Sequence, residues 1–243
     1  MGFSRFYCPD ELYAVQEVAL PEQAAHHASR VLRLKVGEQV TLFNGAGGEY
    51  DATIASMGKQ GVTVNTHARR DRECESPLDI TLVQAISSGE KMDFTLQKAV
   101  ELGVKSIQPV ISSRSVVRLE GERAEKRVQH WQNVVISACE QSGRNRVPLV
   151  GQIMSLNQWF GKSNDAAVKI MLSPRATSRF CELPAPAGKV LFLVGPEGGL
   201  SDTEEDAAVV CGFAAIKLGD RILRTETAAL AAISAMQTLW GDF

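Results

Sequence analysis

The sequence predicts an α/β protein in which a small β-rich domain precedes a larger domain built on a parallel sheet. Two observations lead to this. Short alternating segments, separated by Asn-Gly and Gly-Gly turns, fill residues 1–72, a pattern typical of a small antiparallel barrel. From residue 78 onward, short apolar runs alternate with helical patterns, as buried parallel strands do when crossover helices join them.

The N-terminal region contains one predicted helix among its strands. We expect strands at residues 3–7, 39–43, 50–55 and 62–66. The helix begins at Pro21, where proline suits the first turn, and runs to about Leu32. His26, Arg30 and Arg33 follow one another at spacings of four and three, which places them on one side. Such a line is suited to contacting phosphate, and it is equally the pattern of a solvated helix face.

The segment RRDRECESP, residues 69–77, separates the two regions. It is rich in charge, lacks periodicity and ends in proline, as linkers between domains do. We therefore expect a domain at 1–72, a linker at 73–77 and a second domain at 78–243.

The second region predicts alternating strands and helices. Strands are expected at 78–86, 106–112, 167–172, 190–194 and 213–218, and helices at 88–103, 121–141, 201–212 and from about 227 to Trp240. Ser201 and Glu204 fit a capping box. Pro109 removes a ladder donor and predicts an edge or a bulge. The last helix is apolar nearly all round, which favours burial inside the domain or against another subunit.

Three loops of this region should meet at one edge of the sheet. Residues 172–175, 195–199 and 218–227 each follow a predicted strand, and ligands of open α/β sheets bind outside the carboxyl ends of the strands. The glycines of 195–199 either admit a ligand close to the backbone or simply make tight turns. Neither GxGxxG nor a phosphate P-loop is present, which disfavours ordinary nicotinamide or nucleoside-triphosphate binding.

Composition narrows the classes of protein further. The 243 residues carry a net charge of −2, so any surface for nucleic acid must be local. The five cysteines include no CxxC pair, and we expect reduced thiols, no metal, no membrane segment and a cytoplasmic protein. A basic cluster around the helix at 121–141 is either a phosphate-binding patch or a solvated face; its members are Arg114, Arg118, Arg123, Lys126, Arg127, Arg144 and Arg146.

Two C-terminal motifs carry a resemblance to a known family. LVGPEGGLS at 193–201, followed by LGDRILRTETAALAA at 218–232, resembles the SPOUT superfamily of S-adenosylmethionine-dependent RNA methyltransferases. The resemblance is strongest to the RsmE family, which makes 3-methyluridine at position 1498 of bacterial 16S ribosomal RNA. It extends over the whole chain through RFY (5–7), HHASRVLRL (26–34), SSGEKMDFTLQKAVELGV (87–104) and ACEQSGRNRVP (138–148).

The resemblance implies a PUA-like RNA-binding barrel, a SPOUT domain with a deep trefoil knot, and a homodimer acting on 16S ribosomal RNA in the small ribosomal subunit. S-adenosyl-L-methionine (SAM), the methyl donor, would contact the three loops through the backbone at Leu172, Leu193, Gly195, Gly199, Leu218, Gly219, Leu223 and Thr225. The residues expected to bind RNA are Arg5, His26, Arg30, Arg33, Arg114 and Arg144.

The implied reaction requires that the acceptor atom, uracil N3, be activated. Uracil N3 carries a proton and is a poor nucleophile until that proton leaves, so the site needs a base or a cation that stabilises the uracil anion. We expect Arg224 to stabilise charge on the uracil oxygens, and Glu226 to orient Arg224 or to accept the proton. An Arg224–Glu226 ion pair that only braces the loop remains an alternative. Second candidates are Arg114, Glu140, Gln141 and Arg144.

Three other functions remain open at this point. A ribose 2′-hydroxyl methyltransferase would share the loop motifs and differ in where the methyl is added. A non-catalytic RNA-binding module would bind RNA without SAM and leaves the loops at Gly195 and Arg224 unexplained. A small-molecule enzyme of another α/β class would have no use for the N-terminal barrel.

Overall fold

The computed structural model describes residues 3–117, 119–162 and 166–243, so Arg118 lies outside the described residues. The chain forms two compact units. Unit 1 contains the chain up to Glu75 together with Cys139–Val147, and unit 2 contains Ser76–Ala138 and Pro148–Phe243. The division after Glu75 falls inside the segment expected to be a linker, whereas the sequence did not indicate that Cys139–Val147 belongs with the N-terminal unit.

Unit 1 is built on a five-stranded sheet. Its strands are β1 (Ser4–Tyr7), β3 (Gln39–Phe43), β4 (Glu49–Gly58), β5 (Gly61–Arg70) and β2 (Glu17–Ala19), in that spatial order. The other pairs are antiparallel, but β1 runs parallel to β3. The prediction of an antiparallel barrel is therefore corrected at β1. The three-residue β2 was missed because it is too short for an alternating pattern to show.

The helix of unit 1 changes its winding part of the way along. α1 (Glu22–His26) continues directly into the π-helix η1 (His27–Val31), and the Leu32 N–H donates to the carbonyl of His27, five residues back. A π-helical turn is rare and is often found at functional sites. Ala24 and Ala28 of this segment pack with Phe6, Leu42 and Ile54 in the core of unit 1.

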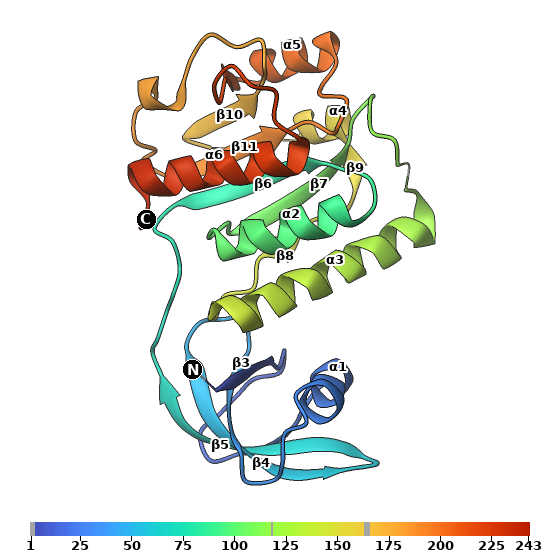
Figure 1. The fold of residues 1–243 in the computed structure, drawn as a ribbon, viewed down its shortest axis with the longest axis vertical. Coiled ribbons are helices and arrows are strands. Elements are labelled where there is room, and N and C mark those ends of the chain that lie inside the picture. The colour runs from blue at the N-terminus through green and yellow to red at the C-terminus, as the bar shows by residue number, and fades with distance from the viewer. Residues whose placement is uncertain (1–2, 118, 163–165) are drawn as a thin grey trace. The chain divides into compact units, whose positions relative to one another are not determined.

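Unit 2 is built on a parallel sheet in the order β12-β10-β11-β6-β7-β8. Figure 1 labels all of these strands except β12. The bounds are β12 (Ala214–Ile216), β10 (Val168–Leu172), β11 (Lys189–Val194), β6 (Asp79–Ala85), β7 (Ser106–Ile111) and β8 (Leu149–Val150). The outer side of β7 pairs first with β8 and then, from Val110, with β9 (Met154–Ser155). Pro109 sits at the break between the two, where no ladder donor is needed, as its sequence position predicted.

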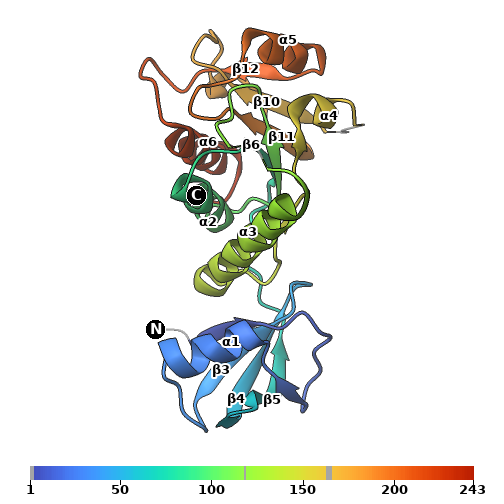
Figure 2. The same cartoon turned by 90° about the vertical axis from the view of Figure 1, so that its right-hand side faces the viewer.

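Helices cover both faces of this sheet (Figure 2). α2 (Glu90–Glu101) and α6 (Thr225–Trp240) lie on one face, and α4 (Leu156–Phe160) and α5 (Asp202–Val210) on the other. Val83, Leu191 and Leu193 pack with Trp159 and Phe213 on the α4–α5 side, so the alternating residues of the same strands face α2 and α6. None of the described helices combines the length and apolarity that crossing a membrane requires.

The chain returns from the sheet edge to its centre after β12. That strand lies at the edge, yet α6, the next element, contacts β11, α2 and the short helix η2 (Phe180–Glu182). This return is consistent with the predicted knot. α3 (Gly121–Ser142) begins in unit 2, and its last turn belongs to unit 1.

Candidate active site

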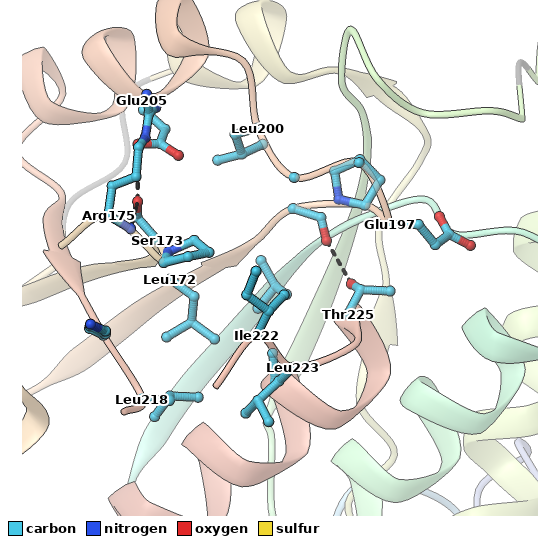
Figure 3. Close-up of a pocket in the computed structure, with 18 of the residues that line it drawn as sticks. Leu172, Ser173, Arg175, Glu197, Leu200, Glu205, Leu218, Ile222, Leu223 and Thr225 are labelled. Atoms are coloured by element: carbon cyan, nitrogen blue, oxygen red, sulfur yellow. Dashed lines mark hydrogen bonds and ion pairs between the residues drawn. The ribbon is translucent and has the colours of Figure 1, made fainter. Parts of the chain in front are cut away.

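A pocket of about 480 Å³ opens at the carboxyl ends of β10, β11 and β12 in unit 2 (Figure 3). The three loops singled out in the sequence form its walls, together with Arg114 and the first turn of α6. The strands are parallel, so loops that are far apart in the sequence emerge side by side. This is the edge at which open α/β sheets bind ligands.

The structure brings seven of the eight expected cofactor contacts to this pocket: Leu172, Gly195, Gly199, Leu218, Gly219, Leu223 and Thr225. Leu193 is the exception, because it does not line the pocket. It is 0% exposed, and it pairs with Met171 on one side and Val83 on the other. A residue in the middle of three paired strands has its backbone groups engaged by the sheet, so Leu193 belongs to the core.

The interior of the pocket combines apolar side chains with backbone polar groups. Leu172, Leu218, Ile222 and Leu223 gather around the hollow (Figure 3), and Ile222 is 86% exposed. A large apolar side chain exposed at a pocket is characteristic of a ligand site. The arrangement suits a ligand with a flat, largely apolar ring and a few polar atoms for the backbone.

The glycine turn at 195–200 closes tightly on itself. A Cβ on Gly195 would lie 3.0 Å from the Leu200 nitrogen and 3.1 Å from the Gly199 carbonyl carbon, and Gly199 has a φ of +67°. Gly195 is therefore needed for close approach and Gly199 for its left-handed conformation. Both residues are needed for the tight turn, and both also line the pocket.

Glu197 anchors the outer side of the glycine turn. Its Oε1 accepts hydrogen bonds from the Ser88 N–H at 3.0 Å, the Ser88 hydroxyl at 2.7 Å and Lys91 Nζ at 3.2 Å. Burial acts to raise the pKa of Glu197, but these hydrogen bonds outweigh it and lower the pKa to about 2. Because α2 has glycine at its N-cap and no side-chain cap, the carboxylate also places a negative charge beside the positive end of that helix.

The loop after β7 holds the other side of the turn. Arg114 Nη1 donates to the carbonyls of Gly198 and Leu200, both at 3.0 Å. Glu204 accepts the Ser113 N–H at 2.7 Å and closes the capping box with Ser201. Burial acts to raise the pKa of Glu204, but the hydrogen bonds from Ser201 and Ser113 outweigh it and lower the pKa. The turn is thus fixed before any ligand enters.

Charged side chains cross the rim of the pocket. Arg175 forms ion pairs with Asp202 and Glu205, each at 2.9 Å, and the Ser173 hydroxyl also donates to Glu205 at 3.1 Å (Figure 3). Arg175 lies in the loop 172–175 that the sequence assigned to the site. Its partners Asp202 and Glu205 were not among the expected site residues, because periodicity does not show which polar residues of a helix start face a loop.

The two residues expected to be catalytic stand beside this pocket without lining it. Arg224 is exposed and is the N-cap residue of α6, and Glu226 is half-buried in the first turn. Within the described chain no ion pair joins them, so the bracing pair left open by the sequence is not formed. One carboxylate oxygen of Glu226, Oε2, is buried and has no hydrogen-bond partner.

The residues expected to bind RNA divide into exposed and buried groups. His26, Arg30 and Arg33 are exposed, but they do not share one α-helical face. The helix has widened into η1, and Arg33 follows it with a φ of +55°. A non-glycine residue held in this region is strained, which is a feature of functional segments. Arg114 is also exposed and lies at the pocket.

Arg5 and Arg144 point into the interior of unit 1, and this corrects their expected role. Arg5 pairs with Glu49 and donates to the Asn145 side chain. Arg144 has a side chain only 3% exposed and pairs with Glu75 at 2.5 Å. A guanidinium buried against a carboxylate is not available to phosphate. Basic residues near a predicted linker cannot be sorted into surface and interior without the tertiary structure.

The remaining second candidates also lie in unit 1. Glu140 accepts the Tyr7 N–H at 3.0 Å, and burial raises its pKa, while Gln141 is exposed. The described residues contain no group of three or more histidine, cysteine or acidic side chains that could hold a metal ion.

Comparison with known proteins adds two family matches. Residues 74–237 match the family model of an RNA methyltransferase domain, and residues 20–66 match that of an RNA methyltransferase PUA domain. The Ribosomal RNA small subunit methyltransferase E of Buchnera aphidicola subsp. Schizaphis graminum is 37% identical over 98% of this chain and 97% of its own length. The protein of that name from Bacillus subtilis is 32% identical over 88% and 87%.

Solved structures agree over the full length. A Ribosomal RNA small subunit methyltransferase E from Neisseria gonorrhoeae bound to S-adenosyl methionine is 48% identical, with a TM-score of 0.93 and 100% of both chains covered. A putative methyltransferase from Legionella pneumophila in complex with the bound cofactor SAM is 39% identical, with a TM-score of 0.97 and the same coverage.

Proposed function

The chain belongs to the ribosomal RNA small subunit methyltransferase E family, and we propose that it transfers a methyl group from SAM to N3 of a uridine in 16S ribosomal RNA, uridine 1498 of the small subunit. The observation that carries the proposal is the pocket of about 480 Å³, in which seven residues expected to contact the cofactor meet. Relatives over the whole chain bind SAM.

The pocket supplies the alignment that methyl transfer needs. The reaction breaks the bond between the SAM sulfur and its methyl carbon, forms a bond between that carbon and uracil N3, and releases S-adenosylhomocysteine. Holding the two reactants in line supplies a large part of the rate. The glycine turn, fixed by Glu197 and Arg114, gives SAM a preformed site.

Arg224 and Glu226 are suited to the acceptor side of the reaction. The N3 proton must leave as the new bond forms. Glu226 has a buried carboxylate oxygen with no partner, which is free to accept that proton. Arg224 is exposed one residue before α6 begins, where its guanidinium stabilises the negative charge that develops on the uracil oxygens.

Unit 1 is the proposed RNA-binding part. It includes the match to the RNA methyltransferase PUA domain, and it presents His26, Arg30 and Arg33 to solvent next to a π-helical turn. Contacts of this kind go to phosphates and fix the position of the RNA.

We also propose a cytoplasmic homodimer. Phe94 of α2 is 47% exposed, and Leu239 and Phe243 at the C-terminal end are 47% and 64% exposed. α2 and α6 pack against each other, so these exposed apolar side chains belong to neighbouring segments that a second copy would cover. Light scattering after size-exclusion chromatography measures the assembly directly; a mass of one chain at micromolar concentration contradicts it.

The test of the reaction uses SAM labelled in its methyl group. The protein is incubated with small ribosomal subunits that lack this modification, and the RNA is digested to nucleosides. Label in 3-methyluridine is the expected result. Label in a ribose-methylated nucleoside contradicts the proposed acceptor atom. Absence of label in both subunits and naked RNA contradicts the proposed methyltransferase activity. Subunits that already carry the modification serve as the control and should take up no label.

A further inference from the structure

Gln84 is a buried amide in an otherwise apolar strand end. It lies near the end of β6, between Val83 and Ala85, and is 0% exposed. Burying an amide is unfavourable unless its polar atoms are bonded. An apolar side chain of the same size would fill this position without that cost. The packing of the sheet therefore does not account for a glutamine here.

Gln84 is also incompletely bonded. Its Nε2 donates to the carbonyl of Ala85 at 2.9 Å and to the Thr225 hydroxyl at 3.2 Å, while its Oε1 is buried with no partner. The reverse orientation of the amide would set an oxygen against the Ala85 carbonyl, so these contacts fix the nitrogen on this side. An unpaired buried oxygen destabilises the fold, so the residue is not explained by stability.

Thr225 connects Gln84 to the glycine turn through a second hydrogen bond. Its hydroxyl donates to the carbonyl of Gly195 at 2.6 Å (Figure 3). Because Nε2 of Gln84 already donates to the same oxygen, the hydroxyl proton is directed at Gly195. Gly195 opens the turn at 195–200, and both Gly195 and Thr225 line the pocket, whereas Gln84 does not. The buried amide therefore acts on the pocket through one intermediate.

We infer that Gln84 is a positioning residue for SAM binding. It orients the Thr225 hydroxyl, and Thr225 holds the Gly195 peptide in the direction that the cofactor contacts. The relay joins the end of β6, the first turn of α6 and the turn after β11. This inference rests on the proposed methyltransferase function.

Replacing Gln84 by Met tests the relay, because methionine keeps the length and volume and removes both polar atoms. We expect SAM to bind about three- to tenfold more weakly by isothermal titration calorimetry, the loss typical of one hydrogen bond. At saturating SAM, kcat should stay within about twofold, since only cofactor binding is affected. The melting temperature should stay unchanged or rise, because the unpaired oxygen is gone. Gln84→Leu is the second variant should Gln84→Met fail to fold.

Gln237→Met is the matched control. Gln237 is also buried, at 1% exposure in the same unit, but its oxygen accepts from Ser76 and its nitrogen donates to Leu102. Its replacement should lower the melting temperature and leave SAM affinity unchanged. A loss of SAM affinity alone in Gln84→Met, and a loss of melting temperature alone in Gln237→Met, would show that the first glutamine positions the pocket and the second supports the fold. A loss of melting temperature at Gln84→Met with unchanged SAM affinity overturns the inference.

Thr225 supplies the test of the pathway. Thr225→Val removes the hydroxyl and should weaken SAM binding by about tenfold, whereas Thr225→Ser should retain it. The double variant Gln84→Met, Thr225→Val should bind no more weakly than Thr225→Val, because Gln84 acts only through that hydroxyl. Additive losses overturn the relay. Unaltered protein that does not bind SAM contradicts the proposed function instead, so the two failures are distinguishable.

Discussion

Residues at the pocket differ in how firmly the fold holds them. Glu197 accepts three hydrogen bonds from the segment that opens α2, and Arg114 bonds two carbonyls of the glycine turn. Arg224, in contrast, is exposed. Side chains tied to the backbone fix the shape of the pocket, while the exposed cation at the helix start is free to move, in keeping with the role proposed for Arg224 on a substrate that arrives from solvent.

Replacing Arg224 by Ala should separate catalysis from cofactor binding. We expect kcat to fall by about a hundredfold, the effect of removing one charge-stabilising group, with the affinity for SAM nearly unchanged, because the side chain does not line the cofactor pocket. Methyl transfer at saturating SAM and calorimetric SAM binding measure the two. Lys189→Ala, at the other end of β11, is the control. A loss of SAM binding in Arg224→Ala would remove Arg224 from the catalytic role.

Glu197→Gln should make stability less dependent on pH. The pKa of Glu197 is lower in the folded protein than its usual value of 4.5, so the carboxylate contributes stability that is fully present above pH 4.5. This contribution is lost as the pH falls toward about 2. The unaltered protein should melt above the variant at pH 7, with the difference shrinking through that window. Glu125→Gln, on the exposed side of α3, should show no such difference. A difference in melting temperature between Glu197→Gln and the unaltered protein that is as large at pH 2 as at pH 7 contradicts the lowered pKa of Glu197.

Elements of unit 2 formed largely as their local sequence predicted. Ser201 and Glu204 form the predicted capping box, and Gly212 ends α5 with a φ of +88°. β10 and β11 fall within one or two residues of their expected bounds. Short elements such as β2 and α4 were not indicated, because a few residues carry too little periodicity.

Ser201→Ala should destabilise α5 and loosen the glycine turn that precedes it. The loss of this cap is expected to cost about 1 kcal/mol of the free energy of unfolding. The Ser201 hydroxyl also donates to Glu204, and Glu204 accepts from Ser113 of the loop after β7. SAM binding should therefore weaken as well, because this contact helps to hold the glycine turn. Urea unfolding and calorimetry measure the two effects. Asp206→Ala, exposed on the same helix, is the control. Equal stability of Ser201→Ala and the unaltered protein contradicts the capping role.

At the scale of the whole molecule, the two units carry separate chemical roles. Unit 1 contains the match to the PUA domain, and unit 2 contains the pocket and most of the match to the methyltransferase domain. Cys139–Val147 belongs to unit 1 although it follows a helix of unit 2. Buried pairs such as Arg144 with Glu75 hold it there, and a buried pair is costly to break on one side.

Charge reversal at Arg33 should weaken RNA binding without affecting SAM. For Arg33→Glu we expect a lower affinity for small ribosomal subunits and a logarithmic salt slope reduced in magnitude by about one, because a phosphate contact is lost. Filter binding over a range of salt concentrations measures both. Lys189→Glu, a charge reversal in unit 2, is the control. Unchanged affinity and slope in Arg33→Glu would remove this residue from the RNA surface.

The sequence by itself determined the α/β class, the parallel sheet and the three loops of the site. Alternation, caps and glycine turns are local signals, and parallel strands bring the loops that follow them to one edge whatever lies between. Seven of the eight positions expected around SAM accordingly line one pocket, and the loop motifs together with the flanking segments were sufficient to identify the family.

Only the tertiary structure decided which polar residues are buried and what they hold. The sequence predicted that Arg5 and Arg144 are surface cations, but they pair with Glu49 and Glu75 from distant segments. Gln84 reads as one polar residue in an apolar run, yet it meets Thr225 from the other end of the unit. Burial and partners arise from contacts between segments far apart in the chain, and those contacts leave no periodic trace in the sequence.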